Sequence, residues 1–156
     1  MVTNNVTRFL DSREIPYQAF ELPSEKLSAE DTAGMLGVSI SEVFKSIVVL
    51  REIKGKPIVA IIPGDEEVDL KLLAKLTGDK KLRVATQAEA ERLTGLKVGG
   101  ISPLALLNRG FQFILSSKAE SLQGIHISGG QRGLNVRLAP SDLLSLTRAE
   151  TGIISH

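Results

Sequence analysis

The sequence predicts an α+β fold in which helices pack around a mixed, largely antiparallel sheet. Two apolar runs, 45–50 and 57–62, are nearly continuous and rich in β-branched residues, as in strands covered on both faces. Segments with helical periodicity separate the strands, and glycines or capping residues mark their ends. Because the 156 residues contain neither an internal repeat nor a low-complexity linker, we expect one domain over 1–156.

Helices are expected where apolar periodicity coincides with capping residues. Ser28 and Thr86 each stand three residues before an acidic residue, the capping-box pattern. Asp69 and the segment 140–142 are the other side-chain caps that we expect at helix starts. The expected helical segments, with their caps, are 3–12, 28–37, 69–78, 86–95 and 140–149, and 41–44 is expected to form a helical turn.

Strands are expected where apolar residues alternate or run together. Alternation along 45–50 places Lys45 and Ile47 on one face and Ser46 and Val48 on the other. Lys54 with Gly55 predicts a hairpin between the two apolar runs. The other expected strands are 15–20, 81–85, 111–115, 125–127 and 134–138.

Composition excludes several classes of function. A net charge of +1 is too small for a protein that coats a nucleic-acid backbone, so RNA must be bound locally and DNA is not an expected partner. With five Phe, one Tyr and no Trp, the chain has too few aromatic rings to predict a platform on which bases stack. The absence of cysteine excludes a disulfide framework and a thiolate nucleophile, and it fits a cytoplasmic protein. No apolar run predicts a membrane span, and the first ten residues do not resemble a signal peptide.

Two glycine-rich blocks predict a site that holds a polar ligand by its backbone. They are 98–103 (VGGISP) and 128–133 (SGGQRG), and eight of the 14 glycines lie between Gly95 and Gly133. Paired glycines allow positive φ and close approach, so their N–H groups can point at a ligand oxygen. With the hydroxyls and the arginine of the blocks, such a site suits a phosphate, a ribose or a polarised carbonyl.

Individual side chains leave alternatives open. Lys45 can hold a phosphate or carboxylate oxygen at the strand mouth, or it can be a lysine with a packed stem and a solvated head. His126 is a candidate general base on the face of Ser128, although a hydrogen-bonded strand histidine is the favoured interpretation. Arg132 can grip an oxyanion or lie solvated in a turn, and Asn135 can line a pocket or face water. With two histidines and no metal-like spacing, we expect no metal site and no cofactor.

Three segments together resemble the YbaK/EbsC family of aminoacyl-tRNA deacylases, which are similar to the editing domain inserted in many bacterial prolyl-tRNA synthetases. The segments are 43–46 (VFKS), 95–104 (GLKVGGISPL) and 127–134 (ISGGQRGL), in matching order and approximate spacing. The likeness runs from near Ile15 to the last expected helix. It implies the curved, barrel-like sheet of YbaK and of the synthetase-associated domain.

The resemblance also implies a function: hydrolysis, in trans, of mischarged Cys-tRNA(Pro) and also Cys-tRNA(Cys). The thiol of the substrate cysteine would attack its own ester carbonyl, so the protein would supply positioning rather than a nucleophile. The implied partner is the aminoacylated 3′ end of tRNA, and prolyl-tRNA synthetase is a candidate second partner. The resemblance implies no membrane association. The implied catalytic residues are Lys45, Gly99 and Gly100, and the implied substrate-binding residues are Ser46, Ile101, Ser102, Ser128, Gly129, Gly130, Arg132 and Asn135.

The chain departs from the family pattern at three places. Residues 44–46 read Phe-Lys-Ser instead of Tyr-Lys-Thr, Leu22 stands where a tyrosine is expected, and Asn135 replaces the Asp of some relatives. The preferred amino acid therefore stays open, and deacylation of Ala-tRNA or Ser-tRNA is the alternative within the family. A module that binds the tRNA acceptor end or a nucleotide without chemistry is an alternative from another class, as is a structural partner of a synthetase.

Overall fold

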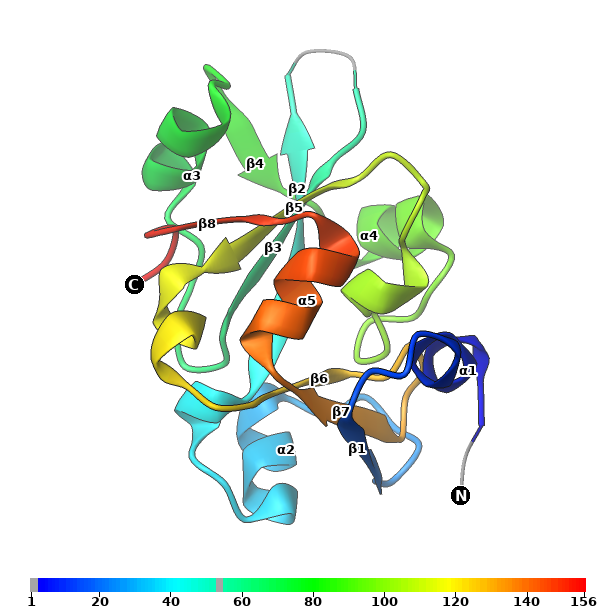
Figure 1. The fold of residues 1–156 in the computed structure, drawn as a ribbon. Helices are drawn as coiled ribbons and strands as arrows, with labels where there is room; N and C mark the ends of the chain where they lie inside the picture. The colour runs from blue at the N-terminus through cyan, green and yellow to red at the C-terminus, as the bar shows by residue number, and fades with distance from the viewer. Residues whose placement is uncertain (1–2, 53–54) are drawn as a thin grey trace.

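The computed structural model describes residues 3–52 and 55–156 (Figure 1). Lys54 of the expected hairpin lies outside the described residues. The helices are α1 (Asn5–Ser12), α2 (Ala29–Leu36), α3 (Leu70–Thr77), α4 (Gln87–Thr94) and α5 (Pro140–Thr147), with 3₁₀ turns at Ile40–Glu42, Pro103–Ala105 and Ser117–Ser121. The strands are β1 (Tyr17–Glu21), β2 (Phe44–Arg51), β3 (Ile58–Pro63), β4 (Leu82–Val84), β5 (Gln112–Ser116), β6 (Ile125–Ser128), β7 (Leu134–Leu138) and β8 (Glu150–Gly152).

The strands form two sheets, which confirms a mixed α+β fold. The larger sheet has the order β4-β2-β3-β5-β8, in which β5 pairs in parallel with β3 and β8, and the smaller sheet β1-β7-β6 is antiparallel. One parallel bridge, between Val43 and His126, joins the two sheets at the start of β2. Because this contact is limited to one residue pair, the described residues form no closed barrel, and the barrel-like expectation is not confirmed.

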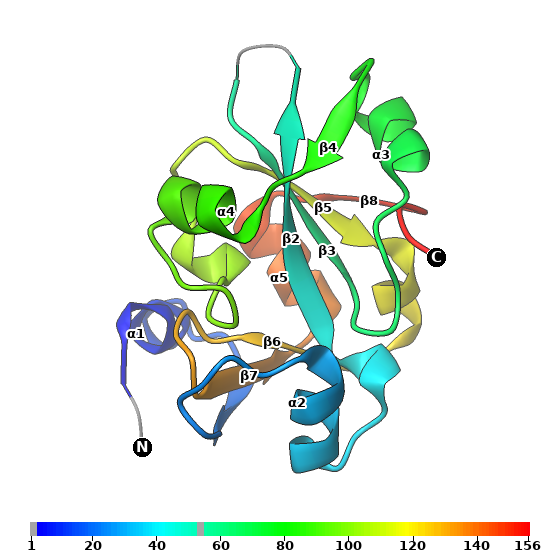
Figure 2. The same ribbon diagram turned by 180° about the vertical axis from the view of Figure 1, so that it is seen from behind.

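The core explains why the two apolar runs look continuous in the sequence. Every residue of β3 is buried, and β2 contributes side chains from both of its faces to the core. Phe44 and Val48 face the core beneath β6, β7 and α5, whereas Val49 faces a second cluster with Leu73 of α3. Figures 1 and 2 show α5 on one side of β2 and β3 and α2 beside the smaller sheet on the other. The expected alternation along β2 is therefore confirmed.

Most helix ends follow from local hydrogen bonds that the sequence already indicates. Ser28 and Thr86 form full capping boxes, and Asp69 caps α3 through the N–H of Leu72. The expected cap at 140–142 is wrong, because Pro140 occupies the first turn and Ala139, which has no side-chain acceptor, stands at the cap. None of the helices within 3–52 and 55–156 has the length and apolar character that a membrane crossing requires.

Several expected boundaries shift by one or two residues. The first helix is capped by Asn4 and begins at Asn5 rather than at residue 3. The helical turn expected at 41–44 is a 3₁₀ turn over Ile40–Glu42, because Ser39 caps it and Phe44 already belongs to β2. The short strand β8 and the 3₁₀ turns at Pro103–Ala105 and Ser117–Ser121 carry no periodic pattern that predicts them.

The two glycine-rich blocks pack directly against each other. A Cβ on Gly100 would lie 2.8 Å from the backbone nitrogen of Arg132 and 2.9 Å from backbone atoms of Gln131. The Arg132 Nε donates to the carbonyl of Val98 over 2.8 Å, which ties the same turns together. Only a glycine at position 100 therefore permits this approach.

We expect Gly100→Ala to destabilise the protein, because the added methyl group must push two backbone segments apart. The expected loss is about 1–3 kcal/mol of unfolding free energy, measured by urea unfolding. Gly34→Ala is the matched control, because Gly34 lies within α2 and a Cβ there meets nothing within 4 Å. That variant should gain about 0.5–1 kcal/mol, and equal stability of the two variants would contradict the close packing of the glycine blocks.

Candidate active site

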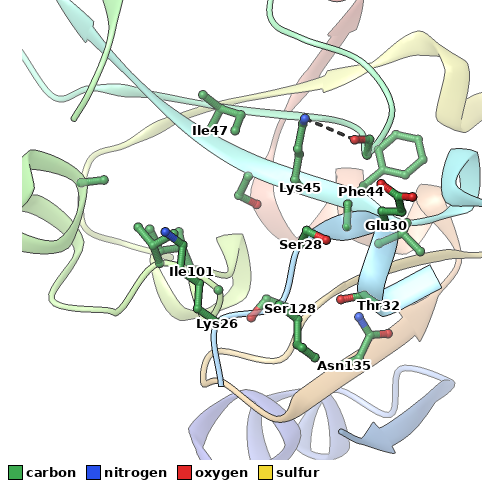
Figure 3. A pocket seen from close by; sticks show the side chains of 18 of the residues that line it. Lys26, Ser28, Glu30, Thr32, Phe44, Lys45, Ile47, Ile101, Ser128 and Asn135 are labelled. Carbon is green, nitrogen blue, oxygen red and sulfur yellow. Dashed lines mark hydrogen bonds between the residues drawn. The ribbon is translucent and has the colours of Figure 1, made fainter. Parts of the chain in front are cut away.

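A cavity of about 820 Å³ opens between the start of α2, the first half of β2, the start of α4 and both glycine blocks (Figure 3). Segments far apart in the sequence meet in its wall. Of the expected site residues, six line it, namely Lys45, Ser46, Gly99, Ile101, Ser128 and Asn135. The other five, Gly100, Ser102, Gly129, Gly130 and Arg132, do not line it.

Lys45 is held in the cavity by a neutral acceptor. Its half-buried side chain donates from Nζ to the carbonyl oxygen of Gly64 over 3.3 Å, the dashed contact in Figure 3. Gly64 follows β3 in a tight turn, where a Cβ would lie 2.5 Å from the Cβ of Ala29 and 2.9 Å from the carbonyl oxygen of Val43. An ammonium has three N–H donors, so two remain for a ligand oxygen.

The first glycine block presents backbone amides to the cavity. Gly99 has a φ of +97°, and the amide of Gly100 donates to the carbonyl of Lys97 over 2.7 Å, closing the turn. The amides of Gly99 and Ile101 have no acceptor among the described residues. The hydroxyl of Ser102 accepts from the amide of Leu104 and is fully buried, which is the role of a turn residue.

The second glycine block supports the wall from behind. The amide of Gly129 donates to the carbonyl of Leu134 over 2.8 Å, and its own carbonyl accepts from Nδ2 of Asn4. The amide of Gly130 donates to the hydroxyl of Ser128 over 3.3 Å, so the glycine fixes the serine that does line the cavity. Arg132, as described above, clamps the first block rather than facing the cavity.

His126 is a buried partner of the wall and not part of it. The imidazole is 2% exposed, lies 5.4 Å from the ring of Phe20, and its Nδ1 lies 2.9 Å from Oδ1 of Asn135. Burial lowers the pKa of His126, and the hydrogen bond with Asn135 opposes this in part. The positive charge of Arg137 lowers the pKa further, and the negative charge of Glu42 raises it. This geometry matches the hydrogen-bonded strand histidine that the sequence analysis favours.

Six charged residues of the wall were not predicted as site residues, namely Lys26 and the acidic Glu25, Glu30, Asp65, Glu66 and Glu67. Lys26, between β1 and α2, lines the cavity and donates from Nζ to Oε1 of Gln87 over 3.0 Å. Glu66 also lines it; although burial raises its pKa, hydrogen bonds from Lys118 and Ser155 bring the pKa below its usual value. Across the described part of the chain, no three His, Cys, Asp or Glu side chains gather in a way that could hold a metal ion.

Comparison with known proteins assigns this arrangement to a family. Residues 24–146 match the aminoacyl-tRNA editing domain. The chain belongs to this family. EbsC of Enterococcus faecalis, assigned as a Cys-tRNA(Pro)/Cys-tRNA(Cys) deacylase, is 36% identical over 148 residues, which are 94% of this chain and 89% of EbsC. The resemblance to the YbaK/EbsC deacylases is thereby confirmed.

Editing domains of this family also occur within longer chains. A proline–tRNA ligase of Geobacter metallireducens is 30% identical over 82 residues, which are 53% of this chain but 14% of the ligase. A crystal structure assigned as a trans-editing enzyme for prolyl-tRNA synthetase superposes with a TM-score of 0.82 at 25% identity, covering 100% of this chain and 99% of that one. The editing domain described here therefore has both inserted and stand-alone relatives.

The lowered pKa of His126 predicts a pH dependence of stability. As the pH falls below about 7, the unfolded chain protonates this histidine first, because the folded chain takes up the same proton only at a lower pH. The folded state then binds fewer protons, so the unfolding free energy should decrease, by at most about 1.4 kcal/mol per pH unit for one group. Urea unfolding of wild type and His126→Asn across this range checks it, since the variant should show a shallower slope. Parallel slopes would contradict a neutral, buried histidine.

Proposed function

We propose that this editing domain hydrolyses, in trans, the aminoacyl ester of mischarged Cys-tRNA(Pro), and also that of Cys-tRNA(Cys). One observation carries the proposal: Lys45, Gly99 and Ser128, from three separate parts of the chain, line the same cavity. A cation, a backbone amide and a hydroxyl are the groups that a phosphate, a developing oxyanion and a ribose require. The similarity to EbsC supports the same substrate class.

In this proposal, different cavity residues bind different parts of the substrate. The Lys45 ammonium takes a phosphate oxygen next to the terminal adenosine, because two of its donors point away from Gly64. The hydroxyls of Ser46 and Ser128 and the carboxamide of Asn135 hydrogen-bond the ribose and the ester. Ile101, which is 8% exposed, supplies an apolar contact for the aminoacyl side chain.

The chemistry requires no nucleophile from the protein. The thiol sulfur of the substrate cysteine attacks the ester carbonyl carbon, and the ribose oxygen leaves with the thiol proton. The cysteine departs as a cyclic thiolactone, which water then opens to free cysteine. Sulfur and carbonyl carbon belong to the same aminoacyl group, so the attack is intramolecular, and the cavity lowers the barrier by holding the conformer in which the two atoms touch. The amide of Gly99, with that of Ile101 beside it, stabilises the oxyanion, and one such donor contributes about 2.7–4 kcal/mol. Gly100 acts indirectly in this scheme, because its amide closes the turn.

An editing role explains why such a separate cavity is useful. A synthetase pocket gains only about 1–3 kcal/mol from a difference of one methylene, so small wrong amino acids are attached at a measurable rate. A second site that cleaves the wrong product corrects this error. Prolyl-tRNA synthetase is the candidate partner, because the domain resembles segments of proline–tRNA ligases.

We expect Lys45→Ala to reduce deacylation of Cys-tRNA(Pro) by about 100-fold, because a charge-assisted contact to the substrate is lost. Initial rates of cysteine release from charged tRNA measure the effect. Lys71→Ala is the control, because Lys71 is equally cationic but lies exposed on α3. Wild-type activity in Lys45→Ala would remove Lys45 from the site.

Cys-tRNA should be cleaved faster than Ala-, Ser- or Pro-tRNA by the same preparation. Alanine and proline lack a side-chain nucleophile, and the hydroxyl of serine is a weaker nucleophile than a thiol. Release should continue in the presence of EDTA, since the scheme assigns no step to a metal ion. Faster release of alanine or serine would instead identify the Ala- or Ser-tRNA deacylase, and saturable tRNA binding without any release would identify a non-catalytic module.

A further inference from the structure

His126 stands on the polar face of the smaller sheet, one row away from the cavity. In the pairing of β6 with β7, Ser128 lies opposite Asn135, and His126 lies opposite Arg137. Residues two apart in a strand share a face, so all four side chains are on one face and His126 reaches Asn135 diagonally. Asn135 lines the cavity, whereas His126 does not. Any influence of His126 on a ligand therefore passes through Asn135.

The contact between them fixes which nitrogen of the imidazole carries the proton. Oδ1 of Asn135 can only accept, and it lies 2.9 Å from Nδ1 of His126. Nδ1 therefore donates, and the neutral ring is the tautomer with the proton on Nδ1. The ring cannot turn away, because it is 2% exposed and lies 5.4 Å from the Phe20 ring, and its backbone pairs with Val43.

This donation determines what Asn135 offers to the cavity. With Oδ1 occupied by His126, the carboxamide has its two N–H donors left, and Nδ2 has no acceptor among the described residues. In the same described part of the chain, no buried side-chain nitrogen or oxygen lacks a hydrogen-bond partner, so Nδ2 must reach the cavity space. Figure 3 shows the nitrogen of Asn135 turned toward the other labelled side chains and its oxygen turned away.

We propose that His126 is a positioning residue that holds the Asn135 carboxamide with its NH₂ group in the cavity, so that this subsite binds an oxygen acceptor of the substrate. The acceptor is the ribose hydroxyl that does not carry the ester, beside the hydroxyl of Ser128. A free carboxamide could rotate and present its oxygen, which would attract the α-ammonium of the aminoacyl group instead. The proposal rests on the proposed function for the identity of the substrate, but the orientation itself is a property of the protein alone.

Two substitutions of His126 distinguish a role in orienting the Asn135 carboxamide from a role in packing alone. The side-chain amide of asparagine can place its Nδ2 where the histidine has Nδ1, so His126→Asn keeps a donor toward Asn135. The amide of glutamine extends to the position of Nε2, so His126→Gln keeps polarity and volume but loses the donor. We expect His126→Gln to raise KM for Cys-tRNA(Pro) about 3- to 10-fold with little change in kcat, because a contact common to ground and transition state is lost. His126→Asn should restore KM to within about twofold of wild type.

The tautomer is measured directly by ¹H–¹⁵N NMR of the imidazole rings. The chain has two histidines, so His156→Gln assigns the remaining signals to His126. We expect the proton on Nδ1 and an unprotonated Nε2 near neutral pH. A proton on Nε2 would mean that Asn135 donates to the ring and shows its oxygen to the cavity, which would overturn the proposal.

The kinetic outcomes are equally decisive. Equal impairment of His126→Asn and His126→Gln, with a matching loss of thermal stability, would reduce His126 to a packing residue. Wild-type KM in His126→Gln would show that the orientation of Asn135 does not matter for the substrate. If wild type released no amino acid from any charged tRNA, the proposed function would fail, while the tautomer measurement would still decide how Asn135 is held.

Discussion

The approach of the two glycine-rich turns is the constraint on which the cavity depends. Position 100 has no space for a side chain, and the neighbouring guanidinium of Arg132 bonds the carbonyl of Val98. Together these contacts bring Gly99 and Ser128 into the wall of one cavity, although 28 residues lie between them in the sequence. Without this packing, the amide and the hydroxyl would lie on separate surface turns.

The same packing gives the individual glycines of the two blocks different structural roles. Of the four paired glycines, Gly99 lines the cavity, whereas the amides of the other three are engaged in hydrogen bonds of the turns. A motif shows that both glycines are needed, but it does not show which amide is already engaged. The amide of Gly100 is engaged with Lys97, three residues earlier, and this bond becomes visible only with the backbone in place.

Features set by neighbours in sequence were predictable, and those set by distant contacts were not. The caps at Ser28, Asp69 and Thr86 are local hydrogen bonds, and the alternation along β2 follows from strand geometry. The way the two sheets meet depends on the bridge of Val43 with His126, and the place of Lys26 in the cavity wall depends on a loop with no periodic pattern. The sequence thus predicted most elements and grouped many of the site residues, but it did not predict their relative orientation.

The anchoring of Lys45 on a carbonyl oxygen has a consequence for how an anion enters. Had a carboxylate held the ammonium, an incoming phosphate would have to break an ion pair and leave a second negative charge stranded nearby. The Gly64 carbonyl is neutral and has two lone pairs, so it can keep one ammonium proton while the phosphate takes the others. The cation is thus preoriented by a neutral anchor and forms no ion pair among the described residues, so a charged ligand need not displace a carboxylate from it.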